Sequence, residues 1–257
     1  GSPLSHEGFS FVYESVSPTV HLASISGGTD ICGCFMLGWP ELPVFAGQIQ
    51  VPALGMDVQV LNSDGTQTKP GDKGELVCMN TFPSAPLFFW GDKENKKYIA
   101  SYFEKFPDIW THGDFVEPTQ ESGFIMHGRS DATLNVAGVR IGTAEIYRIT
   151  EEFEEVLESL AVAQKYESDT RVVLFLKLKP GSDLTDALSD QIKQALKQKA
   201  SPRHVPALVL QAPDFPRTKS GKLVELAVTR AVNKEPIDNL GALANPDCLE
   251  WFKDLNL

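Results

Sequence analysis

The sequence predicts a mixed fold, α/β plus α+β, in which a β-rich first domain is followed by a smaller α+β domain. Three observations predict it. The chain has 257 residues, which is enough for two domains with buried cores. Short apolar runs between glycine and proline turns fill residues 44–128, whereas helical and strand patterns follow one another in residues 131–257. A glycine-rich, charged segment, residues 128–147, joins the two, so we expect domains at 1–130 and 131–257.

The composition is ordinary for a soluble globular protein. It is 42% hydrophobic and 22% charged, with a net charge of -11. This negative charge argues against nucleic acid or an acidic membrane as a partner. No apolar run is long enough to span a bilayer and no signal peptide is visible, so we expect a cytosolic protein without membrane insertion.

The four cysteines do not have the spacing of a zinc site, and no CxxC motif is present. We expect them to be reduced thiols, with the first two buried, and this also fits a cytosolic protein. They are Cys32, Cys34, Cys78 and Cys248.

In the first domain, the apolar pattern predicts a short buried strand at residues 20–25, within a weakly alternating stretch, 9–26. A turn with two glycines, Thr29 and Asp30 follows it. Backbone N–H groups in such a turn can approach a phosphate, although an ordinary tight turn has the same residues.

Residues 44–128 predict a small, mostly antiparallel β subdomain, because short strand patterns there are separated by turn residues. A helix is predicted at residues 93–106. Asp114 then lies beside a glycine and before an apolar stretch. Such an acid could accept hydrogen bonds from ribose hydroxyls, or could only cap a turn. His112 is interpreted as structural.

In the second domain, Thr143 is the predicted N-cap of a helix. Apolar residues on one helical face extend this helix to residue 160, and they are Ile146, Ile149, Phe153, Val156, Leu157 and Leu160. Strands are predicted at 172–178 and 207–210, with an amphipathic helix through Leu184, Leu188, Ile192 and Leu196 between them. A loop, 216–222, and a last helix, 223–232, complete the pattern.

Positive charge is concentrated near the end of this pattern. Against one acid, Glu225, the segment 217–234 has Arg217, Lys219, Lys222, Arg230 and Lys234. These side chains could bind a small anion or could form a solvated helix face. Lys222 stands where the loop meets the helix, which suits a cation that contacts a phosphate or carboxylate. The segment 128–147 also has two interpretations. It could be a hinge whose charged side chains contact an anionic ligand, or it could be a polar linker.

Several motifs occur together in a characteristic order: ISGGTDI, GELVC, HGDF, GRSDATLN, GVRIGTAEIY, SPRHVP and PRTKSGK. With them, the chain resembles the C-terminal part of the adenylate-forming acyl-CoA synthetases. The resemblance covers nearly the whole chain. It implies that residues 1–130 are the end of a large N-terminal domain and that residues 131–257 are its small mobile C-terminal lid.

The resemblance also implies roles for individual residues. Lys222 would be the catalytic lysine, which bridges the acid's carboxylate and the α-phosphate. Asp131 would be the hinge about which the small domain rotates, and Asp30 would help to bind Mg²⁺. Gly138 and Arg203 would lie near CoA. The residues expected to bind ATP and AMP are Gly27, Gly28, Thr29, Asp30, Asp114, Arg129 and Arg140.

The implied substrates are ATP, CoA and a carboxylic acid, which is joined to CoA through an acyl-adenylate. Acetoacetate is the expected acid, because Gly27 stands where acetate-activating relatives carry a tryptophan; acetate or propionate are the alternatives. The phosphate-gripping loop of the family is missing from this sequence. We therefore expect the chain to be a fragment of a ligase that is inactive alone, and a non-catalytic fragment that binds nucleotide or a partner protein remains the alternative.

Overall fold

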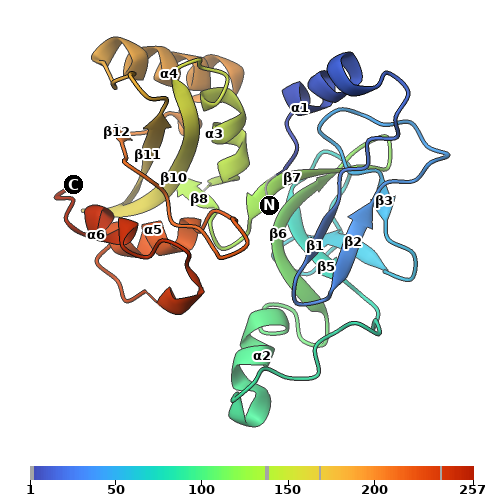
Figure 1. Cartoon of the computed structure of the whole chain (residues 1–257). Coiled ribbons are helices and arrows are strands. Elements are labelled where there is room, and N and C mark those ends of the chain that lie inside the picture. The colour runs from blue at the N-terminus through green and yellow to red at the C-terminus, as the bar shows by residue number, and fades with distance from the viewer. Residues whose placement is uncertain (1–2, 137–138, 168, 238) are drawn as a thin grey trace. The chain divides into compact units, whose positions relative to one another are not determined.

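The computed structural model describes residues 3–136, 139–167, 169–237 and 239–257 (Figure 1). The chain divides into two compact units, Pro3–Ser130 and Asp131–Leu257. The boundary falls at the residue where the sequence analysis predicts the hinge. The predicted mixture of helices and several sheets is confirmed.

The first unit contains two antiparallel sheets, and the larger of them lies in the region, 44–128, for which the sequence predicts antiparallel strands. The smaller sheet has the order β1-β2-β3 and the larger has the order β4-β5-β6-β7. Their strands are β1 (Ser26–Gly28), β2 (Gly33–Leu37), β3 (Val51–Pro52), β4 (Val58–Leu61), β5 (Gly74–Cys78), β6 (Trp110–Pro118) and β7 (Phe124–Arg129). The sequence analysis did not recognise β6, because polar residues and a glycine interrupt its apolar pattern. In the structure the pairing of β6 is irregular at these residues, as expected for a β-bulge.

The predicted strand at residues 20–25 is wrong. This segment is not part of any described strand, and Val20 and Ile25 are 41% and 61% exposed. The apolar pattern there marks side chains that suit burial, but a strand also needs a neighbour for its backbone hydrogen bonds. The weakly alternating residues before it are helical, in α1 (His6–Phe11) and the π-helix η1 (Val12–Val16).

The predicted helix at 93–106 is present but shorter. A 3₁₀ turn, η2 (Lys93–Asn95), leads into α2 (Lys96–Tyr102). The carboxylate of Asp92 accepts hydrogen bonds from the backbone N–H groups of Lys97 and Tyr98, at 3.1 and 2.9 Å, and so satisfies the start of α2. Tyr102 stacks on Trp110 with ring centroids 3.8 Å apart, which joins α2 to β6 in an aromatic core.

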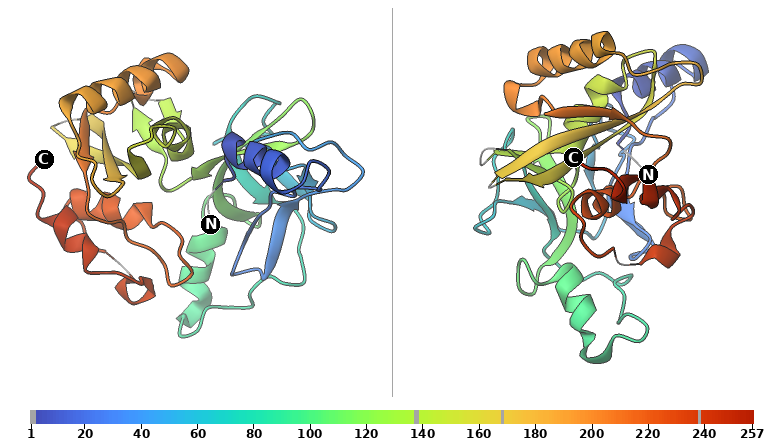
Figure 2. Two further views of the ribbon diagram at one scale, coloured as in Figure 1. Left: turned by 45° about the horizontal axis from the view of Figure 1, so that its top comes forward. Right: turned by 90° about the vertical axis from the view of Figure 1, so that its left-hand side faces the viewer.

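The second unit is a three-layer arrangement around a sheet of order β10-β11-β12 (Figure 2). Strands β10 and β11 are antiparallel, and β11 and β12 are parallel. The elements in chain order are β8 (Leu134–Val136), β9 (Val139–Ile141), α3 (Thr143–Thr150), β10 (Val156–Tyr166), β11 (Asp169–Leu178), α4 (Asp186–Lys199), η3 (Pro202–His204), β12 (Leu208–Gln211), α5 (Glu225–Val232), η4 (Leu240–Ala242) and α6 (Cys248–Lys253).

Alternating residues of β11 pack on opposite faces of this sheet. Leu174 and Leu176 are buried with residues of α3 and α4, whereas Val173 and Phe175 are buried with residues of α5 and α6. A strand that is covered on both faces has a continuous apolar run in its sequence. The strand predicted from such a run at 172–178 is confirmed as part of β11. The predictions for α4, β12 and α5 are also confirmed, to within a few residues at their ends.

The predicted long helix from 143 to 160 is wrong beyond Thr150. Residues from Val156 onward form β10, whose central residues 159–162 are buried on both faces. This central part therefore lacks the alternation of buried and exposed positions that separates a strand pattern from a helical one. The helix ends where Thr150 donates its hydroxyl to Ser159, at 2.8 Å. The N-cap is Gly142 rather than Thr143, and its N–H donates to Glu145 at 2.8 Å.

All four cysteines are free, but Cys32 is exposed and Cys34 is half-buried, so the expectation that this pair is buried is wrong. Cys32 lies in the turn between β1 and β2 with a φ of 47°, and this turn leaves its side chain outside the core. Within the described residues, no helix has the length and hydrophobicity that crossing a membrane requires.

Candidate functional site

The candidate residues fall into one group in each unit. In the first unit they surround the end of β1, where two glycines permit a close approach of backbone. A Cβ atom on Gly27 would lie 2.1 Å from the carbonyl oxygen of Gly33, and one on Gly28 would lie 2.8 Å from the His112 ring. Only glycine fits at these two positions unless β2 or His112 moves.

Asp114 is the buried acid of this group. It is 8% exposed, and its carboxylate accepts hydrogen bonds from Arg129 Nη1 at 3.3 Å and from Ser26 Oγ at 3.4 Å. Burial raises the pKa of Asp114, while His112 and Arg129 oppose that rise. The structure therefore brings together Asp114, Arg129 and the glycines of β1, which the sequence predicted separately.

Gly113 makes the contact between Asp114 and Arg129 possible. Its φ is +82°, and a Cβ atom there would lie 2.5 Å from Arg129 Nη2. The guanidinium lies over this backbone and also donates to the carbonyl of His112, at 3.0 Å. A side chain at position 113 would push the arginine away from the acid.

His112 was interpreted as structural, and it packs under β1. The ring is 8% exposed; Trp110 Nε1 donates to Nδ1 at 3.4 Å, and Nε2 lies 3.9 Å from Asp114. Burial lowers the pKa of His112, which favours the neutral ring. Its contacts with Gly28 and Asp114 were missed because β6 was not recognised as a strand.

Asp30 is exposed and accepts a hydrogen bond from the hydroxyl of Tyr102. Burial and the neighbouring Asp30 raise the pKa of Tyr102, so the phenol keeps its proton. Nothing in the sequence links these two residues, which are 72 positions apart. Thr29 is exposed in the same turn, and its carbonyl accepts from the N–H of Cys32 at 3.2 Å.

No group of three or more metal-ligating side chains occurs in the described part of the chain. Magnesium usually binds through one or two carboxylates and completes its shell with water and phosphate oxygens. The carboxylate of Asp30 could therefore serve as one ligand of a magnesium ion, but the described side chains do not form a complete coordination shell.

In the second unit, Lys222 is exposed on a tight turn that precedes α5. The N–H of Thr218 donates to the Lys222 carbonyl at 2.8 Å, and the N–H of Lys222 donates back to Thr218 Oγ1 at 3.0 Å. Gly221 has a φ of +84°, as the sharp bend requires. The turn thus fixes the backbone of Lys222 and leaves its side chain accessible.

The remaining candidates lie on other elements of the second unit. Asp131 is its exposed first residue. Arg140 is exposed on β9 and donates to Thr133 Oγ1 at 2.7 Å, and Arg203 is exposed in η3. Gly138 is outside the described residues.

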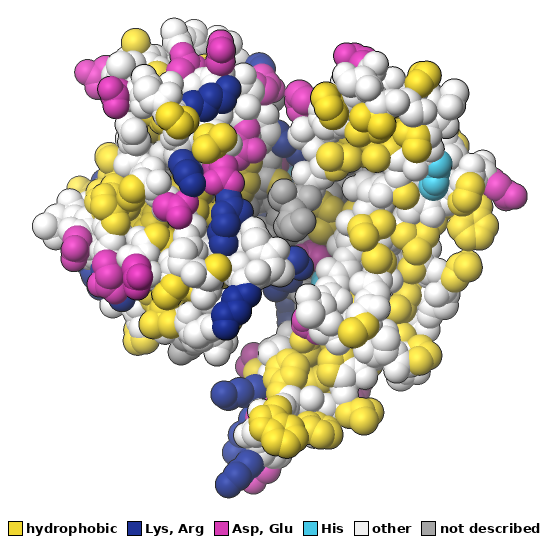
Figure 3. All heavy atoms as spheres, in the orientation of Figure 1, with side chains coloured by type: hydrophobic (Ala, Val, Ile, Leu, Met, Phe, Trp, Pro, Cys, Tyr) yellow, Lys and Arg dark blue, Asp and Glu magenta, His cyan; other side chains and the backbone are white. Residues whose placement is uncertain are grey.

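The basic segment 217–234 is not a uniform cationic surface. Arg217 forms an ion pair with Glu158, and Lys234 donates to backbone carbonyls, including that of Leu255 at 2.9 Å. These two side chains stabilise the fold. Lys and Arg side chains nevertheless follow one edge of this unit on the face that Figure 3 shows.

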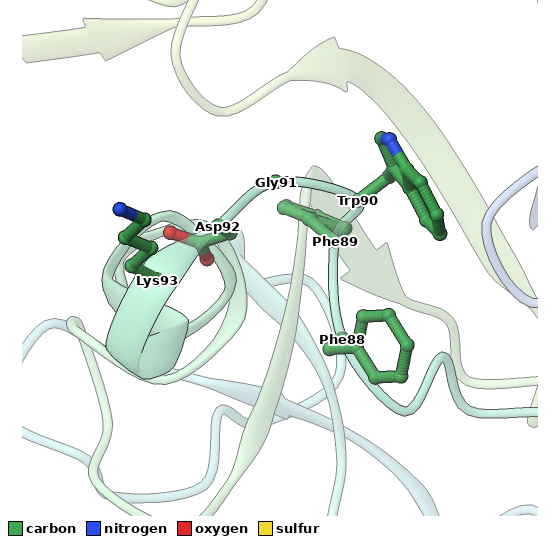
Figure 4. Close-up of a pocket in the computed structure, with 6 residues that line it drawn as sticks. All are labelled: Phe88, Phe89, Trp90, Gly91, Asp92 and Lys93. Atoms are coloured by element: carbon green, nitrogen blue, oxygen red, sulfur yellow. The ribbon is translucent and has the colours of Figure 1, made fainter.

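A shallow depression of about 420 Å³ occurs on the first unit, around the loop before α2 (Figure 4). It is lined by residues 88–93, and the rings of Phe88 and Trp90 project from this loop. Trp90 is 97% exposed. None of the candidate residues lines this depression.

No family model matches the chain. It is 56% identical, over 255 residues, to acetoacetyl-coenzyme A synthetase from Rhizobium meliloti (strain 1021), covering 99% of this chain and 39% of that protein. Acetoacetyl-CoA synthetase from Xenopus tropicalis is 43% identical, covering 99% and 38%. The chain thus spans about two fifths of the length of the curated relatives it matches.

Solved structures of acyl-CoA ligases are also similar to this chain. Acetoacetyl-CoA synthetase from Streptomyces lividans has a TM-score of 0.90 at 39% identity, covering 99% of this chain and 39% of that one. An anthranilate CoA ligase in complex with anthranoyl-AMP has a TM-score of 0.73 at 20% identity, covering 87% and 42%. The second likeness extends the fold alone to more distant ligases.

Proposed function

We propose, on the premise that this chain is homologous to the acetoacetyl-CoA synthetases and fits their C-terminal portion, that the protein joins acetoacetate to CoA. ATP would be converted to AMP and diphosphate through an acyl-adenylate. The observation that carries the proposal is an identity of 41–56% to eight such synthetases over 99–100% of the chain. The arrangement of the candidate residues supports it.

The first unit would bind the nucleotide. Asp114 would accept hydrogen bonds from the ribose hydroxyls, and its carboxylate is already oriented by Arg129 and Ser26. Arg129 is half-exposed on its side chain, so it could contact the nucleotide and Asp114 at the same time. Gly27, Gly28 and Thr29 would lie along the adenine and α-phosphate.

Asp30 would provide one carboxylate oxygen to Mg²⁺, which would offset negative charge on the phosphates when bound. The hydroxyl of Tyr102 donates to this same carboxylate, which supports the idea that one oxygen is kept in a fixed direction. The other oxygen of the exposed carboxylate would then be available to the ion.

Lys222 would act in the first step, in which a carboxylate must approach a phosphate of like charge. A fixed ammonium between them lowers the energy of the transition state, where negative charge accumulates. The accessible side chain on a hydrogen-bonded turn supports this role. Removal of the lysine after the first step would require the second unit to rotate at Asp131.

Arg140 would contact the nucleotide, and Gly138 and Arg203 would lie near CoA. The exposure of Arg140 and Arg203 is compatible with these roles. For the acid itself, the glycine at position 27 has a second explanation, because pairing with β2 leaves no room for a side chain. The choice among acetoacetate, acetate and propionate therefore needs a substrate panel on the intact enzyme.

The test of the proposed function compares the two half-reactions of the intact enzyme in Lys222→Ala. We expect acetoacetate-dependent exchange of diphosphate into ATP to fall about 10²–10³-fold, as for loss of one electrostatic contact in a transition state. Formation of acetoacetyl-CoA from preformed adenylate should remain near the wild-type rate. Lys219→Ala is the matched control, since Lys219 is an exposed lysine on the same turn. Equal losses in both half-reactions would contradict the assigned role.

The chain by itself should show binding without turnover. Because it spans two fifths of its relatives, part of the acyl and ATP pocket would be missing. Calorimetry with AMP should detect weak binding that Asp114→Ala removes. Production of acetoacetyl-CoA by the 257-residue chain alone would contradict this expectation.

A further inference from the structure

The turn that carries Lys222 is held to its unit by backbone contacts, such as the N–H of Lys219 donating to the carbonyl of Ala242 at 3.2 Å, and by the side chain of Arg217. Arg217 begins the turn and pairs with Leu223 in an isolated antiparallel bridge. Its Nη1 donates to the carbonyl of Gly221 at 2.9 Å, and its Nη2 donates to the carboxylate of Glu158 on β10. The peptide group immediately before Lys222 is thereby connected to the central sheet.

Both acceptors require the planar, forked guanidinium. An arginine presents several N–H groups at fixed angles and can bond a carboxylate and a carbonyl together, whereas a lysine ammonium has no such geometry. The Arg217 side chain is 31% exposed, so its bonds are partly shielded from water. Thr218 and Gly221 close the turn internally, but these bonds do not connect it to β10.

The base of the turn is held by further polar contacts. Asn245 Oδ1 accepts from the N–H of Arg217 at 2.8 Å, and its Nδ2 donates to Asp214 at 2.9 Å. Lys177 Nζ lies 2.7 Å from Asp214 and 4.0 Å from Glu158. Two acids and two cations therefore alternate around the base, with Arg217 as the member that reaches the turn.

We propose that Arg217 is a positioning residue for the adenylation step: it fixes the turn so that Lys222 presents its ammonium in one direction. The inference rests on the proposed role of Lys222. The backbone contacts of Thr218 and Lys219 hold the first half of the turn, whereas Arg217 holds the peptide group next to Lys222, so loss of Arg217 would let the ammonium spread over more positions. A displacement of about 1 Å at a reacting group can reduce a rate about 10²-fold.

The test uses the intact enzyme with Arg217→Lys, which retains the charge, and Glu158→Gln, which removes the charge that orients the arginine. We expect Arg217→Lys to lower kcat for adenylate formation about 10–100-fold, with KM for ATP nearly unchanged. The thiol step from preformed adenylate should keep its rate. Glu158→Gln should change kcat in the same direction by less, and the amide of Lys222 should exchange its hydrogen faster in both variants.

Arg171→Gln is the matched control. Arg171 is also a half-buried arginine in this unit, but it bonds to Gln164 at 2.7 Å and stacks on Tyr166, far along β11 from Lys177. It should leave both half-reactions unchanged.

Each outcome bears on the inference. Wild-type adenylation in both Arg217→Lys and Glu158→Gln would overturn it, and so would a raised KM for ATP with unchanged kcat, which indicates direct substrate contact. Equal loss in both half-reactions with a lower Tm would indicate a folding role and would also overturn it. If Lys222→Ala abolishes adenylation while Arg217→Lys and Glu158→Gln do not slow it, only this inference fails. If Lys222→Ala also leaves adenylation unchanged, the proposed function fails.

Discussion

The hydroxyl of Ser130 donates a 2.7 Å hydrogen bond to Oε1 of Glu75, a carboxylate that is only 2% exposed. The other oxygen of Glu75 accepts from Lys105 Nζ at 2.5 Å. The N–H of Ser130 also donates to the carbonyl of Gly113, at 2.8 Å. The last residue of the first unit is therefore fixed to β5 and β6, and the second unit starts at the next residue, Asp131.

Ser130→Ala should lower the free energy of unfolding of the chain by about 1–2 kcal/mol, because one oxygen of a buried carboxylate loses a hydrogen-bond donor. Urea unfolding monitored by tryptophan fluorescence measures this change. Ser101→Ala is the control, since the exposed Ser101 hydroxyl bonds only to the backbone of its own helix at Lys97, and it should change stability by less than about 0.5 kcal/mol. An unchanged Ser130→Ala variant would show that the Glu75 contact contributes nothing.

Gly113→Ala should separate Arg129 from Asp114, because the new methyl group would occupy the place of the guanidinium. We expect a loss of about 1–3 kcal/mol in stability, from a strained positive φ and from a displaced ion pair. The chain should also lose its affinity for AMP in calorimetry. Gly55→Ala separates the two causes: its φ is +79° with nothing within 4 Å, so it adds strain without a clash. If Gly113→Ala and Gly55→Ala lowered stability and AMP affinity equally, the result would argue against the Arg129 contact.

His112 should make the first unit sensitive to mild acid. Burial lowers the folded-state pKa of His112 below the ordinary 6.5, against the opposing effect of Asp114; Arg129 also faces the ring and lowers this pKa. As pH falls through 6.5 the unfolded chain therefore takes up the proton before the folded chain does, and stability decreases until pH falls below the folded-state pKa. Above about pH 7.5 the ring is largely neutral in both states and contributes almost no slope.

His112→Gln should remove part of this dependence. The measurement is the free energy of unfolding at about pH 7.5 and about pH 5.5, compared between variant and wild type. Asp114 has a raised pKa and acts with the opposite sign, so the comparison uses the difference between variants rather than the absolute slope. His6→Gln, on the exposed side of α1, is the control. A slope that is identical in His112→Gln and wild type would refute the assignment.

Asp131→Pro should slow the thiol step of the intact enzyme and spare adenylate formation, because proline fixes φ at about -65° and resists rotation at this residue. Rapid-mixing measurements of the two half-reactions test this expectation. Asp131→Ala removes the same carboxylate without fixing φ, and it should be much less impaired. Similar rates for the alanine and proline variants would mean that the carboxylate, not rotation, matters at this position.

The sequence by itself determined the elements whose periodicity is unambiguous. The repeat of Leu188, Ile192 and Leu196 specifies α4, because such residues meet on one side only in a helix. The apolar run of β11 specifies a strand that is covered on both faces. The sequence also predicted that the glycines at 27 and 28 and the acid at 114 contact a ligand, but it did not predict that these residues lie close to one another.

Only the tertiary structure decided between helix and strand in the segment that became β10, since residues buried on both faces satisfy either pattern. It also decided which distant residues meet: Tyr102 with Asp30, Ser130 with Glu75, and Arg217 with Glu158, separated by 72, 55 and 59 positions. Local patterns record which face of an element is buried. They do not determine which distant elements pack together, and that packing sets the partners of each buried charge.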